Sequence, residues 1–370
     1  EDFKNSFELD ISDARFTSLG LFGYTSFDAS RYFEDVDFKI TDRAIPEMMY
    51  KLFRYVIVVD HFHNDLKLHE FVYGDEPGNL ERIEQIIFSN RFSTFRFSSK
   101  GEESTNYSDR EFIELIEKGK QHCYKGDVFQ IVLSRRFTHP FQGDEFNVYR
   151  ALRSINPSPY LFYFDFGSFK LFGSSPEAQL QIKNNHAYIY PIAGTFRRSG
   201  NDQEDAALAE KLSADTKESA EHVMLVDLAR NDLSRYAHNV TVEKYREIYT
   251  YSHVVHMVSN VRGTLSTSYS PYALMASTFP AGTLSGAPKY KAIQLISEIE
   301  PGPRGIFGGA VGFIGLDGNL NHAIIIRSFL SKKGVLKYQA GAGVVNGSTP
   351  EGELAEVNSK VTALRMAVDK

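Results

Sequence analysis

Apolar residues in the first half of the chain follow patterns that predict strands. Residues 54–60 form a nearly continuous apolar run, typical of a buried strand, and residues 129–137 alternate between apolar and polar side chains. Residues 160–166 and 169–173 flank Gly167-Ser168, a turn sequence that predicts a hairpin. The regular alternation indicates sheets with one face turned towards a core.

The last third of the chain has the clearest strand pattern. Residues 307–316, 321–331 and 335–345 predict three strands, separated by short turns at 317–319 and 332–334. Because short turns join neighbouring antiparallel strands, we expect the three strands to form one antiparallel meander.

Helical periodicity and capping signals predict four helical regions. Residues 80–88 and 205–236 show helical spacing of apolar residues. Ser108 to Glu111 reads as a capping box that opens a helix ending near Lys125, with Gly126 as its stop. A second capping box, Ser348 to Glu351 with Pro350 in the first turn, opens a final helix that reaches Asp369.

Strands and helices are mixed without a regular strand–helix–strand rhythm, so we predict an α+β fold rather than a parallel sheet. The polar stretch from Ser98 to Ser108 is the best internal boundary. It divides the chain into an N-terminal region, 1–100, that contributes to a sheet, and a main region, 101–370.

Composition narrows the class of protein. The chain has 370 residues, a net charge of -6 and 42% hydrophobic residues, enough for a large core. Without a sustained basic patch or a long apolar run, we expect neither nucleic acid nor membrane as a partner. The first residues do not resemble a signal peptide, and the single cysteine, Cys123, excludes an internal disulfide. Both observations favour a cytoplasmic protein.

Two pairs of carboxylates recur at helical spacing. Glu218 and Glu221 are three residues apart, as are Glu353 and Glu356, and Lys360 follows four residues later. Residues at this spacing share one helix face, so two converging helices could hold Mg²⁺, which prefers oxygen ligands. Glutamate is also common on solvated helix faces, and from spacing alone this second interpretation is the more frequent one.

Arg327 follows three isoleucines in the middle strand of the predicted meander. A guanidinium in an apolar strand needs an anionic partner. That partner is either a ligand carboxylate or a protein carboxylate in a structural ion pair, and the residue pattern leaves both open. Glycine clusters at 308–312 and 341–343, in the two outer strands, indicate close backbone approach.

Several motifs together resemble one family of enzymes. The chain is similar to the chorismate-utilising enzymes, most closely the anthranilate synthase component I family, and the resemblance runs from about Gly20 to the C-terminus. The motifs that carry it are Gly126 to Gln130, Asn156 to Tyr160, Ser174 to Glu177, Pro191 to Thr195, Glu218 to Asp232, His253 to Val258, Gly282 to Lys289 and the predicted meander.

This resemblance implies a fold and a reaction. The fold is two facing antiparallel sheets with helices outside. The reaction is Mg²⁺-dependent: ammonia adds to chorismate, the 4-hydroxyl leaves, and loss of pyruvate gives anthranilate, the first step of tryptophan biosynthesis. No Gly-x-Cys-x-Gly glutaminase motif is present, so a separate glutamine amidotransferase subunit is implied, with tryptophan as a feedback inhibitor.

The resemblance also implies roles for individual residues. Glu177 is the general acid, His256 assists pyruvate elimination and Thr283 contacts the ring. Glu221 and Glu356 bind Mg²⁺ directly, with Glu218 and Glu353 acting through water. The implied substrate-binding residues are Gln130, Gly194, Thr195, Phe307, Arg327, Gly341, Gly343 and Lys360. The implied tryptophan pocket comprises Asn156, Pro157, Ser158, Pro159 and Tyr160.

Two positions select among the related reactions. Ala193 stands where aminodeoxychorismate synthases carry a nucleophilic lysine. Gln130 stands where isochorismate and salicylate synthases carry a lysine base, and an amide cannot activate water. Both favour anthranilate formation, with aminodeoxychorismate synthase, or a non-catalytic subunit that binds chorismate or tryptophan, as alternatives. Phe307 departs from the family's usual tyrosine, and we expect a further N-terminal segment with a Leu-Leu-Glu-Ser motif to precede Glu1.

Overall fold

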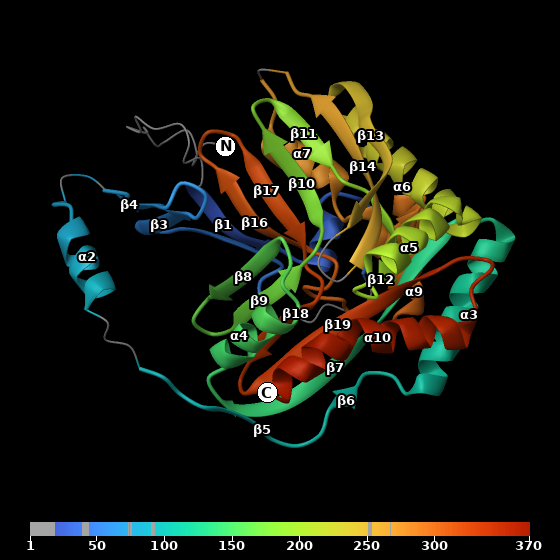
Figure 1. The fold of residues 1–370 in the computed structure, drawn as a ribbon, viewed down its shortest axis with the longest axis horizontal. Coiled ribbons are helices and arrows are strands. Elements are labelled where there is room, and N and C mark those ends of the chain that lie inside the picture. Colours follow the sequence, from blue (N-terminus) through green and yellow to red (C-terminus); the bar gives the residue numbers. More distant parts are fainter. Residues whose placement is uncertain are drawn as a thin grey trace.

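The computed structural model of the protein describes residues 19–38, 44–72, 74, 76–89, 93–250, 254–266 and 268–370, without the side chains of Thr195, Arg197, Lys217 and Val254. Two large sheets dominate the structure, with helices on their outer sides (Figure 1). Within the described part of the chain, every strand pairing is antiparallel. The α+β prediction is confirmed.

The larger sheet has nine strands. Their order in space is β12 (Ile192–Arg197), β14 (Val254–Thr264), β11 (His186–Ile189), β10 (Ala178–Lys183), β17 (Leu320–Ile324), β16 (Ala310–Gly315), β1 (Gly20–Thr25) and β2 (Met48–Leu52), with β13 (His238–Thr250) also paired to β14. Residues that lie far apart in sequence therefore become neighbours, which brings the middle and the end of the chain together.

The smaller sheet has eight strands. Their order is β15 (Gly286–Ala287), β7 (Gln130–Gly143), β19 (Val335–Val344), β18 (Ser328–Lys332), β9 (Lys170–Ser175) and β8 (Tyr160–Asp165), while β5 (Phe97–Ser99) and β6 (Ser104–Thr105) also pair with β7. The predicted hairpin around Gly167-Ser168 is confirmed as β8 and β9. The strand predicted at 129–137 is also confirmed, and it continues to Gly143.

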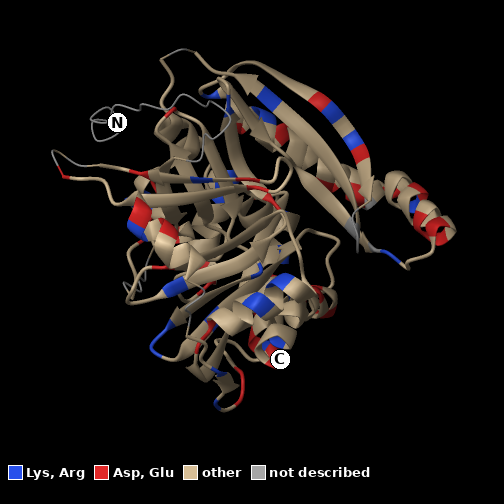
Figure 2. Cartoon of the chain, turned by 60° about the vertical axis from the view of Figure 1, so that its left-hand side comes forward, with Lys and Arg blue, Asp and Glu red and all other residues tan. Residues whose placement is uncertain are grey.

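The described part of the chain contains the helices η1 (Phe27–Tyr32), α2 (Leu80–Phe88), α3 (Asp109–Lys125), α4 (Phe146–Ile155), α5 (Asp202–Ala214), α6 (Thr216–Ser234), α7 (Pro271–Thr278), α8 (Gly282–Ser285), α9 (Lys289–Ile299) and α10 (Pro350–Val368). The helices predicted at 80–88 and 108–125 are confirmed as α2 and α3. None of the helices in the described residues is long and apolar enough to cross a bilayer. Figure 2 shows acidic and basic residues interspersed over the helices and along the outer strand β13.

Three apolar clusters join these layers. The first lies between the two sheets and contains residues from both, namely Tyr24, Leu171, Val311, Ala323 and Leu330. The second packs the outer face of the eight-stranded sheet against α3, α9 and α10, with Phe112, Ile131, Leu133, Ile293 and Val361 among its members. The third packs the nine-stranded sheet against α6 and α7 through Leu180, Val226, Leu233 and Leu274. The two sheets therefore face each other, as expected.

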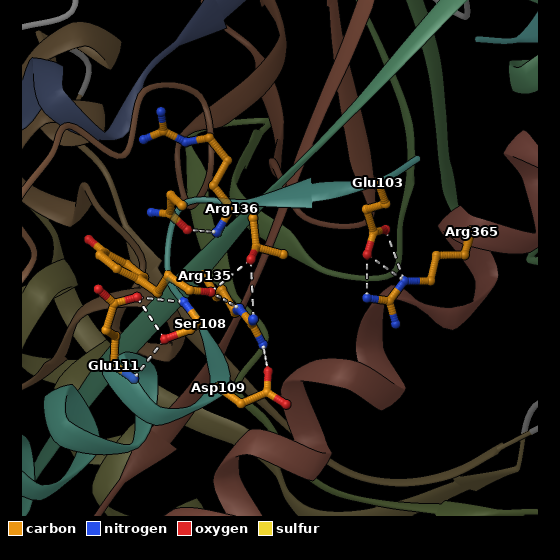
Figure 3. A network of polar contacts seen from close by, with 10 residues as sticks. Glu103, Ser108, Asp109, Glu111, Arg135, Arg136 and Arg365 are labelled. Atoms are coloured by element: carbon orange, nitrogen blue, oxygen red, sulfur yellow. Dashed lines mark hydrogen bonds and ion pairs between the residues drawn. The ribbon is translucent and has the colours of Figure 1, made fainter. Parts of the chain in front are cut away.

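The start of α3 follows its sequence signal. Ser108 accepts a hydrogen bond from the Glu111 amide, and the Glu111 carboxylate accepts one from the Ser108 amide, so the predicted capping box is present. Gly126 ends the helix with φ of 81°, in the left-handed region. Figure 3 shows how Arg135 of β7 holds this helix start by donating to Asp109.

The meander prediction is wrong, because the middle strand is split between the two sheets. Residues 320–324 pair with β16 and β10 in the nine-stranded sheet, whereas residues 328–332 pair with β19 and β9 in the other sheet. Between them the chain crosses from one sheet to the other, and Arg327 has φ of 49°. Two hairpins therefore replace one meander, and Arg327 lies at the crossing.

Three further predictions need correction. The predicted box at Ser348 is absent: Thr349 is the N-cap without a side-chain bond, and the Ser348 hydroxyl accepts from the Val345 amide. The helix predicted over 205–236 is interrupted at Asp215, whose carboxylate caps α6 by accepting from the Glu218 amide. The strand predicted at 54–60 is not buried. It is β3 (Tyr55–Asp60), which among the described strands pairs with β4 (Asp65–Glu70) alone, in a small hairpin with one exposed face.

Candidate active site

Glu177 and Thr283 meet near the crossing between the sheets. Glu177 lies between β9 and β10, and its main-chain oxygen accepts a hydrogen bond from the Ile324 amide. Thr283 lies in the short helix α8 and donates through Oγ1 to Glu177 Oε1 at 3.0 Å. Burial raises the pKa of Glu177 to about 7, although Thr283, Arg327 and Lys360 each lower it. The carboxyl is thus partly protonated near neutral pH, which suits proton donation.

The charge of Arg327 acts on the same carboxyl. Its carbonyl accepts from the Ser174 amide at 3.2 Å, which ties the crossing to the strand that precedes Glu177. Burial lowers the pKa of the guanidinium, while the Glu177 charge raises it. Among the described side chains, no carboxylate makes a salt bridge with Arg327. The structural ion pair considered from the sequence is therefore not found there, and a ligand carboxylate remains the proposed partner.

Gly194 creates a narrow space between β12 and helix α6. The register between β12 and β14 shifts between Ala193 and Thr195, and Gly194 has φ of 72°. A Cβ atom at this position would lie 2.5 Å from Leu212 and 3.1 Å from Glu218 Oε2. Only glycine therefore fits both the conformation and the close approach of Glu218.

His256 lies beside the same glycine. Its Nδ1 is 3.3 Å from the Gly194 carbonyl, and its strand position pairs with Thr195. Burial lowers the pKa of the imidazole, so the neutral form, which can accept a proton, is favoured at neutral pH. The side chain of Thr195 lies outside the described part of the structure.

Gln130 links the eight-stranded sheet to helix α6. Its Nε2 donates to Glu221 Oε1 at 2.9 Å. Gly343, on the neighbouring strand β19, leaves room for this amide, because a Cβ atom there would lie 2.4 Å from Gln130 Nε2. The close approach predicted from the glycine cluster is present at this point.

Lys360 and Glu356 form a pair on α10. The Lys360 ammonium is 2.6 Å from Glu356 Oε1 and donates to the Gly341 carbonyl at 2.9 Å. These contacts anchor the exposed side chain of Lys360 to strand β19, which carries the predicted substrate-binding residues Gly341 and Gly343.

The predicted magnesium ligands carry carboxylate oxygens, which suit the ion, but their side chains are not gathered into one cluster. Glu221 accepts from Gln130, and Glu356 pairs with Lys360, whereas Glu353 is only 7% exposed. In the described residues, no three acidic, histidine or cysteine side chains lie close enough together to hold a metal ion. Carboxylate oxygens match the preference of Mg²⁺, which keeps several waters and takes few protein ligands. By its donor chemistry this set fits the ion.

Comparison with known proteins gives the family. The model of the chorismate binding enzyme family matches residues 3–366. The chain belongs to the chorismate-binding enzyme family. Anthranilate synthase component 1 of Acetivibrio thermocellus is 39% identical over 95% of this chain and 75% of its own length, and that of Aquifex aeolicus is 39% identical over 95% and 74%.

A solved structure from this family confirms the fold. The crystal structure of anthranilate synthase component I from Streptococcus pneumoniae superposes with a TM-score of 0.86 at 31% identity, covering 98% of this chain and 85% of that one. The facing sheets described above are thus the architecture of a chorismate-binding enzyme.

Phe307 is not in a strand, in contrast to the sequence prediction. It lies in the turn before β16, is 4% exposed and packs with Leu284 and Ile324. Its ring also lines a cavity with about 600 Å³ of empty space, part of it open to solvent, together with Arg304 and Ile326. The position connects α8, which carries Thr283, to the crossing that carries Arg327.

The residues of the predicted tryptophan pocket lie at the start of β8. Tyr160 accepts a hydrogen bond from Gln181 Nε2 at 2.6 Å, and the Asn156 carbonyl accepts from the Ser174 hydroxyl. Pro157 and Pro159 are exposed. Tryptophan binding by these residues stays a prediction.

Two buried ion pairs beside the site were not recognised from the sequence. Lys289 Nζ lies 2.5 Å from Asp232 Oδ2, and Asp232 lines a small, partly open pocket that Glu177 and Thr283 also line. Arg304 binds Glu300, four residues earlier, with both side chains almost fully buried. The spacing of Glu300 and Arg304 was the only available signal, and such spacing is common on exposed helices.

Proposed function

We propose that this chain is component I of an anthranilate synthase and converts chorismate and ammonia to anthranilate and pyruvate. The observation that carries the proposal is the 39% identity to anthranilate synthase component 1 along 95% of the chain. The site supports it: Glu177 is held near its titration point at neutral pH, and Gln130 and Ala193 occupy the positions where lysine would direct the sister reactions.

In this proposal the first step joins ammonia to ring C2 as the C4–oxygen bond breaks. Glu177 donates a proton to the departing 4-hydroxyl, which leaves as water. Thr283, bonded to the same carboxyl, orients it and contacts the ring. Ammonia is already nucleophilic, so Gln130 needs no basic lone pair. The Gln130 amide occupies the space that a side chain at position 343 would fill, and it donates to Glu221.

In the second step pyruvate is lost and the ring becomes aromatic. Neutral His256 assists this elimination by accepting a proton. Arg327, with backbone amides near Gly343, holds the enolpyruvyl carboxylate, and a bidentate guanidinium suits that group. Lys360, held by the Gly341 carbonyl, supplies positive charge for a substrate carboxylate. The remaining residues of the proposed substrate-binding site are Gly194, Thr195 and Phe307.

We assign magnesium binding to the carboxylates of α6 and α10. Glu221 and Glu356 would hold the ion directly, and Glu218 and Glu353 would act through its waters. Bound Mg²⁺ would neutralise charge on the ring carboxylate of chorismate. We also propose a cytoplasmic enzyme that takes ammonia from a separate glutamine amidotransferase subunit, with free ammonia as a substitute and tryptophan as the inhibitor.

The test is an assay of this chain with chorismate, ammonium and Mg²⁺, with products separated by HPLC. We expect fluorescent anthranilate and pyruvate in equal amounts. Aminodeoxychorismate without anthranilate would identify the folate-pathway activity instead. If no product forms with either ammonium or an amidotransferase partner, while chorismate or tryptophan still binds, the chain is a binding subunit and the proposal is refuted.

A further inference from the structure

Arg304 is a charged residue that is buried within the protein. It follows helix α9 and is 4% exposed, and its partner Glu300 is 7% exposed. Two parallel hydrogen bonds join them, from Arg304 Nε to Glu300 Oε2 at 2.9 Å and from Nη2 to Oε1 at 2.7 Å. Such bidentate pairs fix the orientation of the guanidinium.

Further hydrogen bonds lock Glu300 in place. Its Oε1 accepts from the Ser134 amide at 2.8 Å and from the Ser134 hydroxyl at 2.9 Å. Asp28 accepts from the Arg304 amide at 3.1 Å and from the Gly305 amide at 2.8 Å. Glu300 therefore holds the Arg304 side chain and Asp28 holds its main chain, so Arg304 can act as a rigid connector.

The remaining donors of Arg304 bind two main-chain carbonyls. Nη1 donates to the Leu284 carbonyl at 2.7 Å, and Nη2 donates to the Val132 carbonyl. Leu284 is the neighbour of Thr283 in α8, and Thr283 bonds to Glu177. Val132 lies two residues from Gln130 and pairs directly with Gly343. The guanidinium also lies 6.0 Å from the ring centre of Phe307.

The buried Arg304 guanidinium thus joins helix α8, which carries Thr283, to strand β7, which carries Gln130. We propose that Arg304, held by Glu300, is a positioning residue that sets Thr283 against Glu177 and fixes the strand that carries Gln130. This inference rests on the proposed function. Arg304 lines the cavity beside Phe307 and not the one shared by Glu177 and Thr283. We therefore assign its effect on Glu177 to the Leu284 and Val132 carbonyls that it binds.

Lysine at this position keeps the charge but lacks the planar fork. It cannot bind Glu300 in two parallel bonds and hold both carbonyls in fixed directions. The α8 turn would then shift relative to Glu177. Small displacements of groups around reacting atoms lower turnover strongly, while substrate binding changes little.

The experiment measures kcat, KM for chorismate and the pH dependence of kcat for Arg304→Lys, with ammonia saturating at each pH. We expect kcat to fall about tenfold with KM within about twofold. The Thr283 bond lowers the pKa of Glu177, so a weaker bond should raise that pKa. The decline of kcat at alkaline pH (the alkaline limb) should therefore move to higher pH. Arg327 and Lys360, the charged groups that also act on Glu177, are unchanged in this variant.

Two comparisons separate positioning from general damage. In a Thr283→Val background, Arg304→Lys should displace the limb no further, because the bond through which it acts is already absent. Arg135→Lys is the matched control: Arg135 is also buried, at 5% exposure, and it donates to Tyr107, Asp109 and Thr105, outside the site. We expect wild-type kcat and limb position for this variant.

Each outcome decides the inference. Wild-type kcat and pH dependence in Arg304→Lys, or equal losses in Arg135→Lys, would overturn it. If Arg304→Lys does not fold, Ser134→Ala takes its place, since it removes one donor to Glu300. A smaller limb shift in the same direction is then expected, and an unmoved limb overturns the inference. A wild-type chain that turns over no chorismate refutes the proposed function instead.

Discussion

The carboxyl of Glu177 shows how opposing forces set one pKa. Desolvation raises it, and a hydroxyl donor and two cations lower it, yet the pKa still rises to about 7. Burial is the largest contribution because the charged form loses its hydration, which the Thr283 donor replaces only in part. A proton donor for a leaving hydroxyl needs this balance, since a carboxyl with an ordinary pKa would be ionised at neutral pH.

The first prediction concerns the pH dependence of turnover. Glu177 must be protonated to act as the acid, so kcat should decline as pH rises through about 7. Glu177→Gln should lower kcat by about two orders of magnitude or more, with KM for chorismate little changed. Steady-state kinetics at saturating ammonia measures both. A decline in kcat that persists at the same pH in a partly active Glu177→Gln variant would assign the titration to another group.

A second prediction concerns Phe307, where the family commonly has tyrosine. The ring packs on Leu284 and Ile324 but borders a cavity with about 600 Å³ of empty space. Phe307→Tyr adds one donor near the proposed enolpyruvyl site, and hydrogen bonds to charged groups contribute about 1.5–3 kcal/mol. We expect KM for chorismate to stay equal or fall. A marked rise in KM would mean that the site is adapted to phenylalanine.

The sequence predicted candidate site residues where they lie in family motifs, and it did not predict the residues that support them. The resemblance assigned Glu177, Thr283, Gln130 and Glu221 to one site without pairing them, and the structure adds the contacts of Thr283 with Glu177 and of Gln130 with Glu221. Their catalytic roles stay predictions. Arg304 was not recognised, because its role depends on carbonyls 20 and 172 residues away. No local pattern encodes such distant main-chain contacts.

At the scale of elements, the split middle strand of the predicted meander is the clearest lesson. Residues 321–331 look like one strand because their apolar character continues through three isoleucines. The break depends on Arg327, which adopts φ of 49° between two sheets. Hydrophobic periodicity reports which residues are buried, but it does not report which sheet buries them. The start and end of α3 were predicted correctly, because the Ser108 capping box and the Gly126 stop are local interactions.

Helix α3 gives a third prediction, on stability. Gly126 ends the helix at φ of 81°, and a Cβ atom there would meet no other atom within 4 Å. Gly126→Ala should therefore lower the free energy of unfolding by about 1 kcal/mol through backbone strain alone. Gly302→Ala is the control, because that glycine also has open space but no left-handed φ. Urea unfolding compares them, and equal losses would contradict the strain account.

A fourth prediction concerns the connection between α6 and α9. Lys289 donates to Asp232 and to the Thr278 carbonyl, and both charged side chains are less than 10% exposed. Asp232→Ala leaves a buried ammonium without its counter-ion and should destabilise the protein by about 3–5 kcal/mol. Adding Lys289→Met should recover part of this loss. Chemical unfolding of the single and double variants measures the coupling, and strictly additive losses would mean that the pair makes no specific interaction.

At the scale of the whole molecule, the proposed site residues come from both sheets. Gln130, Gly341 and Gly343 come from the eight-stranded sheet, whereas Gly194 and His256 come from the nine-stranded sheet. The Gln130–Glu221 bond joins one sheet to a helix that packs on the other. The site therefore forms only when both layers are assembled, which explains why isolated segments of sequence could not define its geometry.

This division between layers leads to a final prediction about metal binding. The proposed direct ligands lie on α6 and α10, which pack on different sheets, so an ion shared by Glu221 and Glu356 would tie the two layers together. Mg²⁺ should raise the free energy of unfolding relative to EDTA, by about 2.7 kcal/mol when its concentration is 100 times the dissociation constant. Urea unfolding at increasing Mg²⁺ measures this without any turnover.

The variants then separate a shared site from nonspecific binding to acidic helices. Glu221→Ala and Glu356→Ala should each abolish most of the Mg²⁺-dependent gain, because either loss leaves the ion attached to one helix only. Glu351→Ala removes an exposed glutamate from the first turn of the same helix α10 and should keep the gain. If all three variants lose the gain equally, the ion binds diffusely and the two helices do not share it. If the gain survives in Glu221→Ala alone, α10 holds the metal without α6, and the proposed ligand set is wrong.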